Sequence, residues 1–382
     1  MSDILIKNIG SIFTGNIDKP VLSPNSILIK NGIIADIADN IAAPPQCEII
    51  DANGMTVTPG LIDSHAHPVL GDFTPRQKML DFIDSSLHGG VTSMISAGEV
   101  HLAGRPKDRD GAKALAVLAY KSFKNAPPSG VKVEGGALIL EKGLTENDFK
   151  ELSEIGINHT GEIGLGTVKP DKEAAEMVEW AKKYGITVMM HVGGTSIPGS
   201  STITYEDVML VKPDVMCHLN GGPTSISIEN IEKLIYESDF TIEIVHCGNM
   251  KMCAEILKIA EKKGCFNRVI IGNDAPSGTG VIPLGILRMI NFVAGICGIP
   301  AEIAICMATG NTAKVYKLNR GIIETGKEGD IVIMDAPMGS VGNDAKSAIE
   351  AGDIPGVACA IIDGVVKFRK SRNTPPSVRK IK

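Results

Sequence analysis

The chain has 382 residues, of which 43% are apolar, and a formal net charge of -6 at pH 7. This length exceeds what one compact core usually needs, so we expect a catalytic domain with a smaller attached domain. No window approaches the run of about 18 uncharged apolar residues that a membrane helix requires, and no long basic run suits nucleic acid, so small-molecule chemistry is favoured.

The N-terminal segment, residues 1–60, predicts a set of β-hairpins. It carries short β-type runs such as SILIKNGIIADI, separated by Asn-Gly, Pro and Gly. Such residues punctuate strands at tight turns.

The central segment, residues 61–321, predicts a parallel sheet wrapped by helices. Apolar, β-rich runs alternate there with segments of helical period, such as residues 75–90 and 171–187. Eight repeats of strand then helix favour a closed TIM (β/α)8 barrel, although the pattern leaves open a doubly wound sheet. The expected strands are residues 56–63, 91–98, 133–140, 159–166, 187–193, 215–221, 241–248 and 268–275.

The C-terminal segment, residues 322–382, returns to strands punctuated by Gly and Asp, as in GDIVIMDAP. Because the two ends of the chain have the same pattern, we expect them to form one small β-sandwich. The predicted domains are therefore residues 1–60 plus 322–382 and residues 61–321.

Metal-ligand side chains stand at the ends of several expected strands, where a TIM barrel carries its functional groups. His65 and His67 end the first strand, and they point the same way because side chains alternate along an extended chain. The other donors, at the ends of the fourth, fifth, sixth and eighth strands, are Glu162, His191, His218 and Asp274. Imidazole and carboxylate together suit Zn or Fe better than Mg or Ca.

A His-x-His pair alone is weak evidence, because most such pairs are structural or incidental. Four of the eight histidines, however, fall at expected strand ends beside two carboxylates. A purely structural explanation would place all of them there by coincidence, so the pattern predicts a metal site.

Two neighbouring ions need a bridging anion, and Glu162 is the candidate. We expect His65, His67 and Asp274 on one ion and His191 and His218 on the other. Water bound to such ions loses its proton near neutral pH, which places hydroxide beside a polarised substrate carbonyl. Asp274 would take the hydroxide proton and deliver it to the departing nitrogen.

The motif PGLIDSHAH, with these ligands on strands four, five, six and eight, resembles the amidohydrolase superfamily over nearly the whole chain. Longer runs, such as GEIGLGT, HVGGTSIPGSS, GNDAPSGTG and SRNTPP, are similar to its enamidase-like members. The resemblance implies hydrolysis of 6-oxo-1,4,5,6-tetrahydronicotinate to 2-formylglutarate and ammonia, a binuclear Zn and Fe centre, and a homotetramer.

Two other classes of function are weighed against this one. A dihydropyrimidinase-, imidazolonepropionase- or adenine deaminase-like activity would use the same metal site. A metal-free scaffold is disfavoured, because all six strand-end positions hold competent donors.

The chain departs from the general superfamily pattern at Glu162, where many members carry a carboxylated lysine. Either group supplies one bridging negative charge, so lysine carboxylation should be unnecessary here. His246 ends the seventh strand, where the superfamily pattern has no ligand, and it could contact substrate or pack in the core.

Three substrate-binding candidates lie on loops. Arg105 follows the second strand and suits a bidentate contact with a carboxylate, although a solvated charged loop explains it equally well. Thr195 and Ser196 follow His191 in a Gly/Ser/Thr-rich loop that offers N–H and hydroxyl groups, although its glycines also fit a tight turn.

The N-terminus and the cysteines indicate a cytoplasmic protein. The start MSDILIKNIG lacks the features of a secretory signal. The eight cysteines contain no CxxC pair, which argues against disulfides and zinc fingers.

Overall fold

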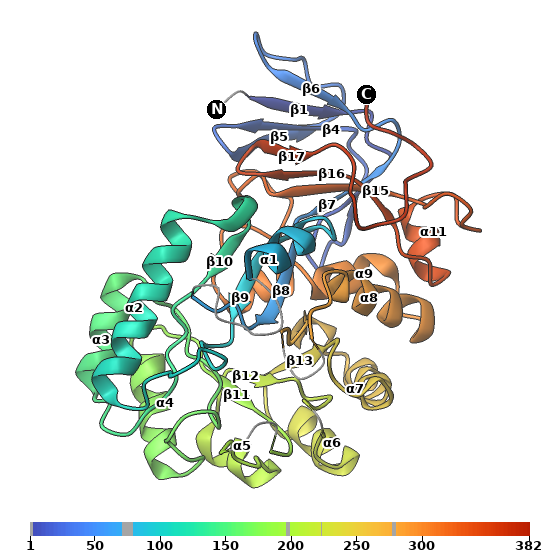
Figure 1. Cartoon of the computed structure of the whole chain (residues 1–382). Coiled ribbons are helices and arrows are strands. Elements are labelled where there is room, and N and C mark those ends of the chain that lie inside the picture. The colour runs from blue at the N-terminus through green and yellow to red at the C-terminus, as the bar shows by residue number, and fades with distance from the viewer. Residues whose placement is uncertain (1–2, 71–78, 196–198, 223, 277–279) are drawn as a thin grey trace.

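The computed structural model describes residues 3–70, 79–195, 199–222, 224–276 and 280–382. It consists of a barrel surrounded by helices and a β-sandwich packed against it (Figure 1). Within these residues, no helix combines the length and the apolar character needed to cross a membrane.

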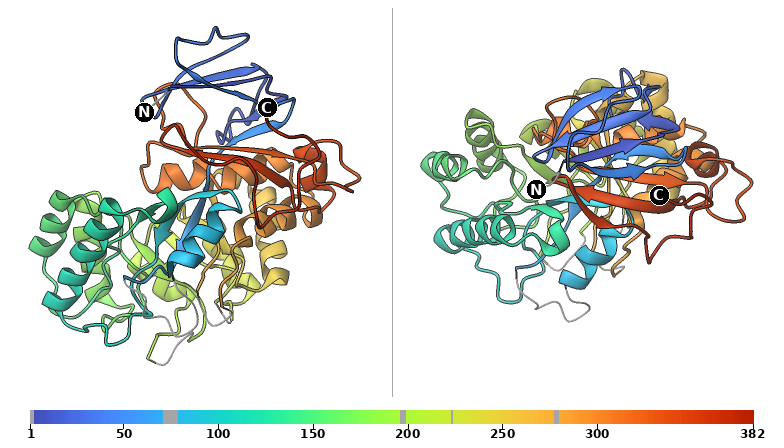
Figure 2. Two further views of the ribbon diagram at one scale, coloured as in Figure 1. Left: turned by 45° about the horizontal axis from the view of Figure 1, so that its top comes forward. Right: turned by 90° about the horizontal axis from the view of Figure 1, so that it is seen from above.

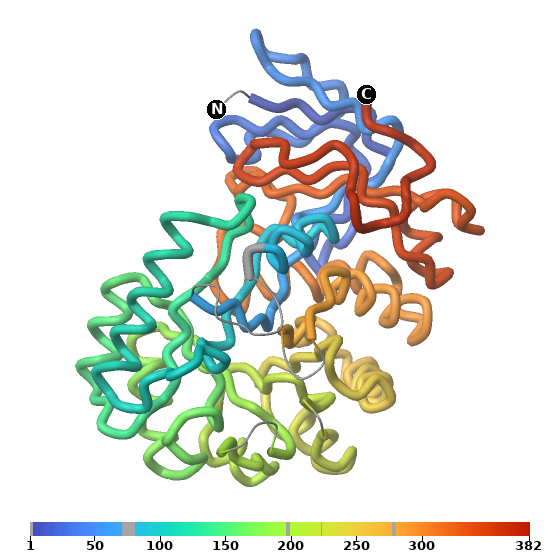
Figure 3. The backbone as a smooth tube through the Cα atoms, in the orientation of Figure 1, coloured from blue at the N-terminus to red at the C-terminus, as the bar shows by residue number. Residues whose placement is uncertain are grey.

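The β-sandwich is built from both ends of the chain, as expected, and Figure 3 shows the two ends side by side. One sheet has the order β5-β4-β1-β6 and the other β17-β16-β15-β7-β2-β3. The strands of the first are β1 (Ile4–Lys7), β4 (Ser26–Lys30), β5 (Ile33–Ala38) and β6 (Glu48–Asp51). Those of the second are β2 (Ser11–Phe13), β3 (Val21–Leu22), β7 (Thr56–Pro59), β15 (Ile331–Asp335), β16 (Gly356–Ile362) and β17 (Val365–Phe368).

Local sequence explains the sandwich. The β4–β5 hairpin turns at Asn31 and Gly32, which both have positive φ, at 50° and 79°. These are the values that the type I′ turn of an Asn-Gly hairpin requires. An isoleucine-rich core lies within the sandwich, and β15 pairs with β7 to join the two ends of the chain.

Seven of the eight expected barrel segments contain a regular strand in the described part of the chain. They are β8 (Leu61–Ala66), β9 (Val91–Ser96), β10 (Lys132–Glu134), β11 (Met189–His191), β12 (Val215–Cys217), β13 (Thr241–Val245) and β14 (Val269–Gly272). The expected fourth strand, residues 159–166, is irregular and forms only isolated parallel bridges, Leu138 to Thr160, His159 to Thr187 and Ile163 to Met190.

The barrel closes between its first and last strands. The N–H of Asp274 donates to the carbonyl of His65 at 2.8 Å, and the N–H of His67 donates to Ala275 at 2.9 Å. A buried cluster from five strands, together with Tyr316, fills the interior.

The TIM barrel and the terminal sandwich are thus confirmed, and the doubly wound alternative is wrong. The limits proposed for the two domains, at 60/61 and 321/322, stay a prediction.

Helices cover the outside of the barrel, and Figure 2 shows both chain termini at the sandwich end of the molecule. The predicted helix at 171–187 begins after the N-cap Asp171, whose side chain accepts from two backbone N–H groups. It ends at Lys183, with Tyr184 as the C-cap before Gly185 (φ 74°). The helices are α1 (Met79–Leu87), α2 (Arg109–Asn125), α3 (Glu146–Ile155), α4 (Lys172–Lys183), α5 (Tyr205–Val211), α6 (Ile228–Glu237), α7 (Met250–Lys263), α8 (Gly285–Asn291), α9 (Ala301–Met307), α10 (Gly310–Val315) and α11 (Ala345–Glu350).

Candidate metal centre

The six expected donors come together at one end of the barrel. Five elements supply them: the end of β8, the irregular fourth strand, the end of β11, the residue after β12 and the loop after β14. All of these residues are buried: His65, His67, Glu162, His191, His218 and Asp274.

A first donor group surrounds the Nε2 atoms of His65 and His67, which lie 3.3 Å apart. Asp274 Oδ1 lies 3.2 Å from His67 Nε2 and 3.7 Å from His65 Nε2. Glu162 Oε2 lies 3.5 Å and 3.8 Å from the same two nitrogens.

These spacings fit a metal ion. Ligands at about 2.0–2.2 Å from one tetrahedral ion lie roughly 3.3–3.6 Å from each other. The five distances of the first donor group, from 3.2 to 3.8 Å, scatter around that range. These five distances therefore suit donor atoms that share one coordination shell.

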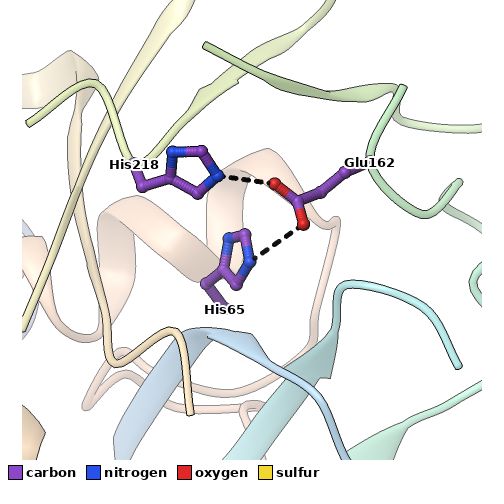
Figure 4. A group of neighbouring side chains, drawn as sticks. All are labelled: His65, Glu162 and His218. Carbon is purple, nitrogen blue, oxygen red and sulfur yellow. Dashed lines mark hydrogen bonds and ion pairs between the residues drawn. The ribbon is translucent and has the colours of Figure 1, made fainter. Parts of the chain in front are cut away.

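A second donor group lies on the other side of Glu162. Its Oε1 atom is 2.8 Å from Nε2 of His218, and Nδ1 of His191 is 3.1 Å from the same nitrogen. Figure 4 shows the Glu162 carboxylate between His65 and His218, with one oxygen toward each. One carboxylate therefore faces both donor groups.

Outer hydrogen bonds orient three of the four imidazoles. Nδ1 of His65 donates to Glu243 Oε2 at 2.7 Å, and Nδ1 of His67 donates to the Gly98 carbonyl at 3.4 Å. Nε2 of His191 donates to the Gly194 carbonyl at 2.7 Å. In each ring the other nitrogen faces the centre, where the neutral form of the imidazole would present the lone pair that metal ligation requires.

The charges of the site stabilise cations. Burial alone would lower the pKa of His65, but Glu243 and Glu162 raise it well above its ordinary value. Burial would raise the pKa of Glu162, but His65 and His218 hold it well below its usual range. Burial, with His218 beside it, lowers the pKa of His191 to about 4, so this imidazole is neutral at pH 7 and able to act as a ligand.

Two of the donors stand on strained backbone. His218 has φ 33° and Asp274 has φ 56°, both in the left-handed region that residues with a side chain rarely adopt. Strain of this kind persists where the surrounding structure enforces it, and it is frequent at functional sites.

Arg105 already has protein partners. Its Nη1 atom lies 2.6 Å from Glu141 Oε1, its Nη2 atom donates to the Leu165 carbonyl at 3.2 Å, and its side chain is buried. The alternative of a solvated loop is therefore wrong for this side chain. Its contact with substrate stays a prediction.

The substrate-binding roles of Thr195 and Ser196 stay predictions. Thr195 is exposed and its hydroxyl lies 3.1 Å from that of Thr202. Ser196 lies outside the described residues. His246 is half-buried, burial and Arg288 lower its pKa, and no described residue bonds its Nδ1 atom.

A basic cavity of about 650 Å³ opens between the loops that follow β9 and Glu162. Four cationic residues line it, Arg105, Lys107, Lys142 and Lys169. All three lysines are exposed at the surface. Such a cavity attracts anions.

Sequence reasoning missed Glu243. It stands in the middle of β13, between Ile242 and Ile244, and it is fully buried. A carboxylate inside an otherwise apolar strand is rare unless it has partners, and that signal could have found it.

Comparisons with known proteins agree with this geometry. The sequence pattern described as "Amidohydrolase family" matches residues 56–367. Enamidase from Eubacterium barkeri is 56% identical over 384 residues, which cover 100% of both chains. A solved crystal structure of enamidase, at 56% identity and the same coverage, superposes with a TM-score of 0.96. Adenine deaminase from Ruegeria sp. (strain TM1040) is 27% identical over 331 residues, 82% of this chain and 51% of that protein.

Proposed function

Because the chain belongs to the amidohydrolase family, and is thus a C–N hydrolase, we propose that it hydrolyses 6-oxo-1,4,5,6-tetrahydronicotinate to 2-formylglutarate and ammonia. The observation that carries the metal-dependent part is the position of Glu162, whose two oxygens face the two donor groups at 2.8 and 3.5 Å. The full-length identity of 56% with enamidase supports the substrate.

The six donors would hold two divalent ions, His65, His67 and Asp274 at a first position, His191 and His218 at a second, and Glu162 between them. Bound ions of this kind polarise a carbonyl and activate water at neutral pH. Zn and Fe are proposed because the enamidase resemblance implies this pair, and imidazole with carboxylate suits either metal.

Asp274 is the proposed proton carrier. Burial would raise the pKa of Asp274, but its hydrogen bond with His67 and the nearby His65 and His218 lower it. The carboxylate is therefore ionised at neutral pH and able to accept a proton from attacking water. It then passes this proton to the ring nitrogen as the C–N bond breaks.

The chemistry of the substrate accounts for ammonia. Its lactam nitrogen is also an enamine nitrogen, so opening the ring releases an enamine that tautomerises to an imine. A second water molecule converts the imine to an aldehyde and ammonia. Two waters are thus consumed for each ammonia released.

The basic cavity is proposed to attract the substrate carboxylate. The substrate is an anion and the product carries two carboxylates, whereas the lining of the cavity includes Lys107, Lys142 and Lys169. Arg105, held by Glu141, is the proposed contact deepest in this region.

A homotetramer in the cytoplasm completes the proposal. The tetramer follows from the enamidase resemblance. No disulfide links any of the eight cysteines, all of which lie within the described part of the chain, and this suits a reducing compartment.

The experiment is an assay of ammonia release and ring opening from 6-oxo-1,4,5,6-tetrahydronicotinate. Adenine and a dihydropyrimidine serve as comparison substrates. Chelation should abolish turnover and divalent metal should restore it. Ring opening without ammonia would indicate a simple lactamase, and no turnover of the tetrahydronicotinate by metal-loaded protein would refute the proposed substrate.

A further inference from the structure

Glu243 is a fully buried carboxylate that the proposed reaction does not use directly. Three donors converge on it: Ser64 Oγ at 2.6 Å from Oε1, His65 Nδ1 at 2.7 Å from Oε2, and the backbone N–H of His218 at 3.2 Å from Oε2. Burial of an ionised carboxylate is tolerated only with such partners. Glu243 therefore connects a ligand of the first donor group with the backbone of a ligand of the second.

Glu243 contacts the outer nitrogen of His65, and we assign this contact to a hydrogen bond. His65, Cys217 and Glu243 do offer three donor atoms close together. The 2.7 Å between His65 Nδ1 and Glu243 Oε2 is a hydrogen-bond distance, and the Nε2 atom of the same ring faces His67 in the first donor group.

This contact adds negative charge on one side of the centre only. A carboxylate bonded to the outer nitrogen of an imidazole raises the basicity of the ligating nitrogen. The outer partners of His67 and His191 are neutral backbone carbonyls, and no described residue bonds Nδ1 of His218. Among the described residues, three carboxylates thus contact the first donor group, namely Glu162, Asp274 and Glu243, whereas Glu162 alone contacts an imidazole of the second.

We propose that Glu243 is a positioning residue that makes the two metal positions unequal, so that the ion beside His65, His67 and Asp274 is held more tightly than the ion beside His191 and His218. The inference rests on the proposed metal-dependent function. Glu243 acts through the imidazole of His65 and does not reach the reacting atoms.

The test measures stepwise metal dissociation constants, by competition with a chromophoric chelator and Zn²⁺, for the wild type and Glu243→Gln. Glutamine keeps an oxygen for His65 and the N–H of His218, while Ser64 can turn its hydroxyl to accept from the new amide. In Glu243→Gln, the dissociation constant of the tightly bound ion should increase about 10- to 100-fold. The dissociation constant of the weakly bound ion should change by less than about threefold.

A matched control is Asp148→Asn on α3. Asp148 is also a buried carboxylate with charged partners, Arg109 and Lys113, but it is not among the donors of the centre. This variant should leave both metal constants unchanged. The inference would be overturned if both dissociation constants increased equally in Glu243→Gln, or if neither increased.

A second measurement needs no variant. Wild-type crystals are partly chelated to one ion per chain, and the remaining ion is located by anomalous diffraction. The inference places it beside His67 and Asp274, and a peak beside His191 would overturn it. Wild-type protein that binds two ions of equal affinity contradicts the inference alone, whereas protein that binds none contradicts the proposed function as well.

Discussion

Glu162 Oε1 lies 2.8 Å from Nε2 of His218, while the second oxygen of the same carboxylate faces the opposite donor group. One carboxylate therefore faces both donor groups, as the proposed bridging role of Glu162 requires. Glu162 reaches both groups from the irregular fourth strand of the barrel, and the dispensability of lysine carboxylation stays a prediction.

Asp274→Asn should leave the fold intact and remove turnover. Asparagine tolerates the left-handed conformation that residue 274 adopts at φ 56°, but a neutral amide cannot carry a proton. We expect kcat to fall by at least about 100-fold, the lower range for loss of a general acid/base. Ammonia release reports kcat, and circular dichroism with metal analysis shows whether the variant is folded and loaded. A folded, loaded variant with normal turnover would exclude Asp274 as the proton carrier.

Glu99 should make stability fall as the pH rises. Burial raises the pKa of Glu99 to about 7 from 4.5, although the N–H of Leu70 bonds its carboxylate. The folded state therefore retains a proton that the unfolded state loses between pH 4.5 and 7. Glu99→Gln lacks this titration, so its stability relative to the wild type should rise by about 3 kcal/mol between pH 4 and pH 8.

Urea unfolding at pH 4, 6 and 8, with chelator throughout to hold metal occupancy constant, measures this difference. Asp63, whose pKa burial also raises to about 7, is present in both proteins and cancels. A stability difference that does not change with pH would show that Glu99 titrates normally.

Lys142 and Lys169 should speed the binding of the anionic substrate. Replacing both with glutamine removes two charges from the basic cavity and should lower kcat/KM roughly two- to tenfold at low salt. The difference in kcat/KM between the wild type and this double variant should decrease as ionic strength increases. Lys258→Gln, an exposed lysine on α7 paired with Glu255, is the control and should change nothing. An effect that is independent of salt would argue against electrostatic attraction.

Lys132 should stabilise the junction between barrel and sandwich. Its Nζ atom lies 2.6 Å from Glu328, 2.9 Å from the buried Asp330 and 2.6 Å from Asp363. Lys132→Met leaves these carboxylates without their shared cation, which should cost about 3–5 kcal/mol in the free energy of unfolding. Urea unfolding measures this loss. The double variant Lys132→Met/Asp330→Asn should regain part of the free energy of unfolding that the single variant loses. No loss in the single variant would mean that water or Arg320 replaces the ammonium group.

Strand periodicity favoured the barrel without excluding a doubly wound sheet, and the placement of the six donors at expected strand ends predicted that they would meet. The alternation at His65 and His67 predicted a shared direction, and their Nε2 atoms lie 3.3 Å apart. The fourth strand could not be predicted as irregular, because its regularity is lost through tertiary contacts. Gly161 packs against Ala97, and Gly164 adopts φ 111°.

Contacts between distant segments account for what sequence reasoning missed. Glu243 acquires its role from Ser64 and His65, 179 and 178 residues away. Arg105 is held by Glu141, 36 residues away, and no local pattern indicates the direction of that loop. The positive φ of His218 likewise reflects the packing of the barrel mouth, since Glu243 bonds its backbone N–H.

The most direct test of the account is an anomalous difference map of metal-loaded protein, recorded at the Zn and Fe absorption edges. We predict two peaks about 3.5–4 Å apart, the separation usual in two-metal sites, each coordinated by a different oxygen of Glu162. A single peak, or two peaks with Glu162 bound to only one of them, would contradict the account.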